Sequence, residues 1–156
     1  MTKRKSRNFC NLEPGSARLA VCRFFILRRL RMKTKGEIEA EISRAIVQFE
    51  IDYMGRGPKE TSAHIVEDLI VVRLKGVLTP AEEQLTKSID GKDLVKKMRA
   101  TLIDKARPLL YQVVGDITGT KILDLHTDIS TESGERVFVF SLDNNLQKSL
   151  AHHKGS

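Results

Sequence analysis

The chain repeats one pattern of apolar and polar positions. A stretch with apolar residues at helical spacing ends at a glycine and leads into two strand-like runs, and the same series then recurs. A shift of 64 positions aligns the two series, pairing Ala45, Ile46, Gln48, Phe49, Asp52, Tyr53 and Gly55 with Leu109, Leu110, Gln112, Val113, Asp116, Ile117 and Gly119. This agreement predicts an internal duplication of a helix–strand–strand unit.

The first unit is predicted to begin with a helix near Gly36. Its apolar face follows three- and four-residue steps through Ile38, Ile42, Ala45, Ile46, Phe49 and Tyr53. Gly55 is expected to end this helix in a left-handed conformation. Two strands are predicted at about 61–66 and 69–77, joined by a tight turn at Glu67-Asp68.

The second unit is predicted to open with a short helix at Thr79-Pro80-Ala81-Glu82, which combines a capping threonine, a first-turn proline and a capping-box glutamate. Asp90-Gly91 is expected to break this helix, and Pro108 to kink the longer helix that follows. The predicted buried stripe of the long helix is Leu94, Met98, Leu102, Ala106, Leu109, Val113 and Ile117. Gly119 is expected to end it, before strands at about 121–129 and 136–142.

These elements predict an α+β fold: a two-layer sandwich with a four-stranded antiparallel sheet and helices on one face. A two-stranded sheet is marginal alone, so both units are expected to share one core. The hairpins could join within the chain or across a homodimer, because an unpaired edge strand favours association. The predicted domain spans 36–143, and a polar C-terminal tail follows at 144–156.

The basic excess of the chain lies before this domain. Residues 1–35 hold 11 Lys or Arg against Glu13 alone, whereas the remainder holds 16 Lys or Arg against 19 Asp or Glu. We predict that residues 1–35 form a disordered leader, or that residues before Met32 are translated sequence upstream of the true start. Nucleic-acid binding by the domain itself is therefore not favoured. Both cysteines, Cys10 and Cys22, lie in the leader, and the chain is predicted to be cytoplasmic.

One strand carries a candidate chemical group. Asp124, His126 and Asp128 alternate along the strand and therefore share one face. Such a face could bind a metal or position a histidine for acid–base chemistry. However, strand residues two apart are separated by roughly 6–7 Å, too far for three in a row to share one ion. A solvated sheet face is the favoured interpretation, and no metal or cofactor is predicted.

Cations near the strands form a second set of candidates. Arg56 lies in the glycine-rich loop at 55–59, which could approach an anion but follows a helix C-terminus, where carbonyls point outward. Arg73 and Lys75 share the outer face of a strand and could meet an acidic partner, although pairing with cross-strand acids is commoner. The sequence has no Walker, dinucleotide-binding, GxSxG or HExxH motif.

Several separated motifs resemble those of the MpsC-like family, named after a subunit of a Na+-translocating, membrane potential-generating system. The resemblance spans about Lys35 to Asp143 and rests on Ala45–Val47, Gly55–Pro58, Val72–Glu82, Ala106–Pro108, Leu125–Thr131 and Gly134–Val137. It implies a non-enzymatic, soluble accessory or regulatory subunit for cation translocation or inorganic-carbon supply. The implied partner is an integral membrane protein, and the implied place is the cytoplasm or the inner face of the membrane.

The resemblance also marks motif positions as candidates for binding a partner or an anion: Arg56, Arg73, Lys75, Arg107, His126, Asp128 and Thr131. Two alternatives stay open. The basic leader and strand cations would suit a small nucleic-acid-binding module, and His126 with Asp128 would suit a metal- or anion-dependent enzyme. The partner, the ion, the strand order and the oligomeric state are not determined by the sequence.

Overall fold

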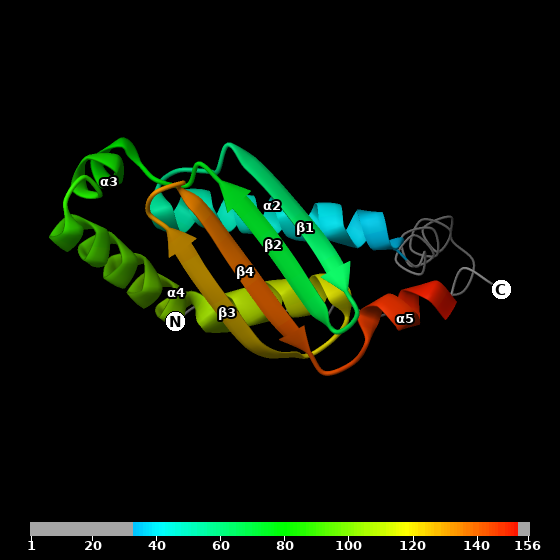
Figure 1. Ribbon diagram of the computed structural model, residues 1–156. Coiled ribbons are helices and arrows are strands. Elements are labelled where there is room, and N and C mark those ends of the chain that lie inside the picture. The colour runs from blue at the N-terminus through cyan, green and yellow to red at the C-terminus, as the bar shows by residue number, and fades with distance from the viewer. Residues whose placement is uncertain (1–32, 153–156) are drawn as a thin grey trace, which may run out of the picture. The chain divides into compact units, whose positions relative to one another are not determined.

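The computed structural model describes residues 33–152 (Figure 1), so most of the predicted leader lies outside the described residues. The described elements, in chain order, are α2 (Lys35–Met54), β1 (Glu60–Val66), β2 (Leu69–Lys75), α3 (Pro80–Leu85), α4 (Ile89–Thr118), β3 (Ile122–Ser130), β4 (Glu135–Leu142) and α5 (Leu146–His152). None of the described helices is long and apolar enough to cross a membrane.

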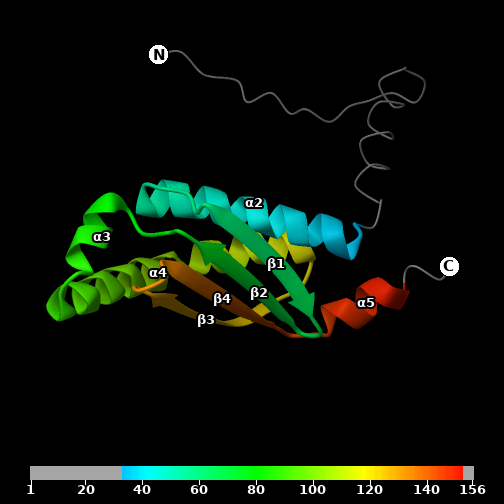
Figure 2. The ribbon, with the colours of Figure 1, turned by 45° about the horizontal axis from the view of Figure 1, so that its top comes forward.

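The four strands form one antiparallel sheet in the order β1-β2-β4-β3. The two hairpins therefore join within the chain, through their second strands. Helices α2 and α4 lie against the same face of this sheet (Figure 2). The predicted α+β two-layer architecture is thus confirmed, and β1 and β3 are the edge strands.

The helix ends follow the local signals of the sequence. Gly55 and Gly119 end α2 and α4 with φ angles of 75° and 69°, the left-handed conformation predicted for both. Both helices thus end 64 positions apart, each followed by a hairpin. The arrangement is that of two similar units, and their origin by duplication stays a prediction.

The connection between α3 and α4 differs in part from the sequence prediction. Thr79 caps α3 in a capping box with Glu82, as predicted: the Thr79 amide donates to Glu82 Oε2 over 2.7 Å. The predicted break at Asp90-Gly91 is wrong, because the interruption falls before Ile89. Ser88 caps α4 by accepting from the Gly91 amide over 3.1 Å, so Gly91 belongs to the first turn.

Gly91 is packed against the end of α3, and its replacement by alanine is expected to destabilise the protein. A Cβ atom at Gly91 would lie 1.9 Å from the carbonyl oxygen of Leu85. The expected cost is about 1–3 kcal/mol of unfolding free energy, as for other overpacked sites. Urea denaturation would measure it. The control is Gly36→Ala in α2, where a Cβ meets nothing within 4 Å and alanine should be neutral or stabilising. A Gly91→Ala variant as stable as Gly36→Ala would contradict this packing.

The core lies between the sheet and the two long helices, but α4 does not bury the stripe predicted from the sequence. Its buried residues are Gly91, Val95, Arg99, Ile103, Ala106, Leu110 and Val114. Of the predicted stripe only Ala106 is among them, and Leu94, Met98 and Leu109 are 57%, 43% and 39% exposed. That prediction was wrong because α4 carries two apolar stripes, and the buried one includes a glycine and an arginine.

Part of the predicted C-terminal tail is helical, and residues 153–156 of that tail lie outside the described residues. Residues 146–152 form α5, and Leu146 is buried against the core. Gln147 fixes this helix to the β1–β2 turn through two hydrogen bonds of 3.2 Å. Its backbone amide donates to the Glu67 carbonyl oxygen, and its side-chain oxygen accepts from the Glu67 backbone amide. The turn itself falls at Glu67-Asp68, as predicted, and Glu67 has a φ of 57°.

Candidate functional site

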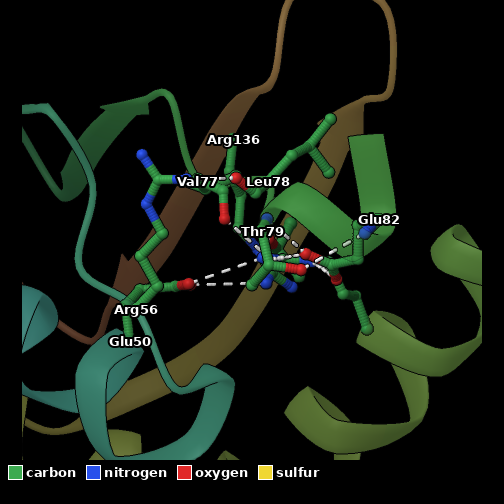
Figure 3. Close-up of polar contacts among 9 residues, drawn as sticks. Glu50, Arg56, Val77, Leu78, Thr79, Glu82 and Arg136 are labelled. Carbon is green, nitrogen blue, oxygen red and sulfur yellow. Dashed lines mark hydrogen bonds and ion pairs between the residues drawn. The ribbon is translucent and has the colours of Figure 1, made fainter. Parts of the chain in front are cut away.

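Four charged side chains meet in the interior of the protein. We call Glu50, Glu82, Arg99 and Arg136 the buried ion cluster, because all four are buried. They come from α2, α3, α4 and β4 and meet beside the loop that joins β2 to α3 (Figure 3). Two carboxylates face two guanidinium groups, so the cluster is formally neutral.

Arg99 is the best-bonded member of the cluster. Its Nε donates to Glu82 Oε1 over 2.7 Å, and its Nη2 donates to Glu82 Oε2 over 2.8 Å. Nη2 also donates to the Val77 carbonyl over 2.8 Å, whereas Nη1 reaches Glu50 only over 3.5 Å. The two-point contact between Arg99 and Glu82 is the strong form of an arginine–carboxylate pair.

Arg136 is held much more loosely. Its Nη1 lies 3.4 Å from Glu50 Oε1, and its Nε lies 3.3 Å from the Thr127 hydroxyl oxygen. Its guanidinium carbon lies 4.9 Å from the centre of the Phe138 ring. The guanidinium group of Arg136 forms no other hydrogen bond to a described residue, although such a group has five N–H donors.

The two ion pairs of the cluster differ in how burial shifts the pKa values of their side chains. Burial raises the pKa of Glu50, and the nearby Arg136 and Arg99 only partly oppose this. Burial also lowers the pKa of Arg136 to about 10. For Glu82 burial acts in the same upward direction, but the hydrogen bonds from Arg99 and from Thr79 outweigh it and lower its pKa. The ion pair between Glu82 and Arg99 is therefore the stronger one, and the ion pair between Glu50 and Arg136 is the weaker one.

Arg136 also borders a groove between α4 and β3. This α4–β3 groove has a cleft of about 460 Å³, lined by Asp93, Lys96, Lys97, Ala100, Thr127, Asp128, Ile129 and Arg136. A second cleft of about 430 Å³ shares four of these residues and extends the groove past Thr131. A buried guanidinium group at a groove wall can hold a negatively charged group.

Three of the cations predicted as site residues bind other groups of the same chain. Arg73 pairs with Glu135 on the neighbouring strand through two contacts of 2.8 and 2.6 Å, and Lys75 pairs with Glu60 over 2.7 Å. Arg56 donates to the carbonyl oxygen of Leu78 over 2.9 Å and so fixes the loop that follows β2. A role for these cations in binding a partner stays a prediction.

The other predicted residues fall into two places along β3. Arg107 donates to the Leu125 carbonyl over 2.8 Å, and its Nη1 lies 3.4 Å from Asp124 Oδ1. His126 Nε2 lies 3.3 Å from the other oxygen of Asp124. Asp128 and Thr131 instead border the α4–β3 groove. In the described part of the chain, no group of three or more His, Cys, Asp or Glu side chains is placed to hold a metal ion.

Sequence reasoning missed the buried ion cluster, although the sequence carries a signal for it. Glu50 continues the four-residue series of Ile38, Ile42 and Ile46. Arg99 stands between Val95 and Ile103 at the same spacing, and Arg136 precedes Phe138, Phe140 and Leu142 at strand spacing. These three charged residues therefore occupy positions that the period assigns to the core.

Comparison with known proteins identifies the family. The chain is 45% identical over 118 residues to the uncharacterized protein YbcI of Bacillus subtilis, which covers 76% of this chain and 95% of that protein. It is 26% identical over 109 residues to the uncharacterized protein YrhF of the same organism, covering 69% of this chain and 89% of YrhF. No solved structure matches it. Residues 34–144 match the family described as the Na+-translocating membrane potential-generating system (MpsC), and the chain therefore belongs to the MpsC family.

Proposed function

We propose that the protein is a non-enzymatic accessory or regulatory subunit that binds an integral membrane protein at the inner face of the membrane. The family description, a Na+-translocating membrane potential-generating system, supports the choice of partner. The arrangement of α4 supports binding through a surface of this chain. The partner we propose is the membrane-embedded subunit of such a system.

The observation that carries this proposal is a second apolar stripe on α4. We define the α4 stripe as Leu94, Met98 and Leu109, which are exposed although they follow a helical spacing. Exposed apolar side chains grouped on one element are typical of a surface that binds another protein.

The position of the stripe also favours docking. α3 and the first turns of α4 extend past the end of the sheet (Figure 1), so this part of α4 is accessible from outside the sandwich. An amphipathic helix with apolar residues four positions apart, as Leu94 and Met98 are, can lie in an apolar groove of a partner. The proposed occupant is therefore a cytoplasmic groove of the membrane subunit.

Photo-crosslinking from Met98 would test this proposal. The full chain would carry a photoreactive side chain at position 98 and be mixed with membranes of its native host. We expect a crosslink to an integral membrane protein that mass spectrometry identifies as an ion-translocating subunit. Leu94→Glu is expected to reduce the crosslink about tenfold, because a charge inside an apolar contact typically removes more than 1.4 kcal/mol of binding free energy.

The matched control is Val66→Glu, which places the same charge at another exposed apolar residue, at the end of β1. It should leave the crosslink unchanged. A crosslink formed only with a second copy of the chain would identify the α4 stripe as a homodimer interface and contradict the proposal. A crosslink equally strong with Leu94→Glu would show that the stripe does not bind the membrane protein.

A further inference from the structure

We infer that the α4–β3 groove is a binding site for a small organic acid, whose carboxylate is held by Arg136 and Thr127. The inference goes beyond the proposed docking role and does not depend on it. It rests on the incomplete hydrogen bonding of a buried arginine, on the side chains around it, and on the geometry with which a guanidinium group binds a carboxylate.

Arg136 is buried, but its guanidinium group is incompletely hydrogen-bonded. The residue is 2% exposed, yet only two of its N–H groups donate to described residues, both over long distances. Among the described residues, no fully buried side-chain nitrogen or oxygen lacks a hydrogen-bond partner. Nη2 of Arg136 has no partner among them, so this atom is not fully buried, and the open space that Arg136 lines is the groove. Donors in such a place favour an acceptor that enters from the groove.

The guanidinium group of Arg136 matches a carboxylate in shape and charge. A guanidinium group is planar and presents parallel N–H groups, so it binds a carboxylate through two contacts. With a pKa of about 10, Arg136 keeps its charge at neutral pH. Glu50, its partner inside the protein, contacts only Nη1 over 3.4 Å. The hydroxyl of Thr127 already accepts from Nε and can donate its own hydrogen to the same ligand.

The lining of the groove favours an organic acid over an inorganic anion. Ala100 and Ile129 provide apolar surface beside Arg136, and the cleft of about 460 Å³ is of the size that holds small ligands. An organic acid can place its carboxylate on Arg136 and its apolar body against these two residues. An inorganic anion would use only the first of these contacts.

The charges at the rim do not oppose an anion. Lys96 and Lys97 stand against Asp93 and Asp128, so the rim is formally neutral, and Arg136 adds a cation at the groove wall that Glu50 offsets from the interior. Asp128 should repel an entering carboxylate less strongly, because its Oδ1 accepts a hydrogen bond from the Ile129 backbone amide over 2.8 Å. Asp93 is the remaining acid that an entering carboxylate would meet.

Titration followed by NMR would test the inference on the full chain. The probes are acetate, butyrate and hexanoate at constant ionic strength, with butyramide as the uncharged analogue of butyrate. We expect saturable shifts of the Arg136 Nε–H and Ile129 amide signals, with a Kd on the order of 1 mM for butyrate. Affinity should rise roughly two- to fourfold for each added methylene. Butyramide should cause no saturable shift.

Three variants connect the binding to the groove. Arg136→Lys keeps the charge but not the planar fork and should weaken butyrate binding about tenfold. Because Arg136 is buried, Ala100→Phe is the second variant: residue 100 is exposed, so its phenylalanine should fill the groove without unfolding the protein. Lys121→Ala, which changes a cation outside the groove, is the control and should bind as the wild type does.

The inference is overturned if none of the acids causes a saturable shift, or if butyramide binds as well as butyrate. It is also overturned if the shifts centre away from Arg136 and Ile129, or if folded Ala100→Phe binds butyrate unchanged. None of these outcomes affects the crosslink from Met98, so the groove and the docking stripe are tested separately.

Discussion

Replacement of Arg99 by methionine is expected to lower the free energy of unfolding by about 3–5 kcal/mol, the usual cost of breaking a buried ion pair by removing one partner. Arg99 is fully buried and is the bonding partner of both Glu82 and Glu50. Methionine fills a similar volume, so the expected loss comes from the charges left behind. Glu82 would lose its two-point contact, and the Val77 carbonyl would lose its donor.

Urea denaturation followed by circular dichroism would measure this loss. The control is Arg73→Met, which breaks an equally well-formed two-point pair with Glu135 on the outer face of the sheet. Because Arg73 is exposed, that change should cost no more than about 1 kcal/mol. Equal effects of the two substitutions would show that burial of the cluster does not determine its contribution to stability.

A double variant would separate the pair from the rest of the cluster. Adding Glu82→Gln to Arg99→Met removes the carboxylate that the single change leaves without its counter-charge, whereas Glu50 keeps Arg136 as a partner. If the charge of Glu82 is the main cause of the loss, the double variant should be more stable than Arg99→Met alone, which is a favourable coupling of about 1 kcal/mol or more. A purely additive result would place the loss in packing instead.

The sequence predicted those parts of the fold that depend on single residues with strong local preferences. Thr79 and Glu82 have the residue types and the spacing of a capping box, which marks the start of a helix. Gly55 and Gly119 can adopt the left-handed conformation that ends a helix. Strand alternation gave the four strands to within a few residues. Their order depends on which hairpin edges pair, and no local pattern distinguishes β2 from β1 as the partner of β4.

The candidate site was predictable only in part, for a related reason. Asp128 and Thr131 were singled out as motif positions, and both border the α4–β3 groove. Arg99 and Arg136 were not, because a charged residue is ordinarily assigned to the surface. They can be recognised as buried only if a residue's position in the apolar period is given more weight than its charge. The partners that neutralise them lie up to 86 positions away in the chain, as Glu50 does from Arg136.

The orientation of α4 leads to the second large effect. Leu110→Ala is expected to lower the free energy of unfolding by about 2–5 kcal/mol, because this side chain is buried under the sheet and its removal leaves a cavity. Leu109→Ala, one residue earlier, should cost less than about 1 kcal/mol, because Leu109 is 39% exposed. The two changes remove the same atoms from neighbouring positions of one helix, so propensity and side-chain chemistry cancel in the comparison.

Urea denaturation of both variants would decide which apolar stripe of α4 faces the core. The opposite order, with Leu109→Ala the costlier change, would mean that α4 is rotated toward the stripe predicted from the sequence. Leu94 and Met98 would then be buried and could not dock to a membrane protein, and Arg99 would leave the interior. The expected order would instead leave an apolar stripe that the described fold does not bury. A folded protein keeps such a surface at a cost in solubility, which is the physical reason to look for its partner.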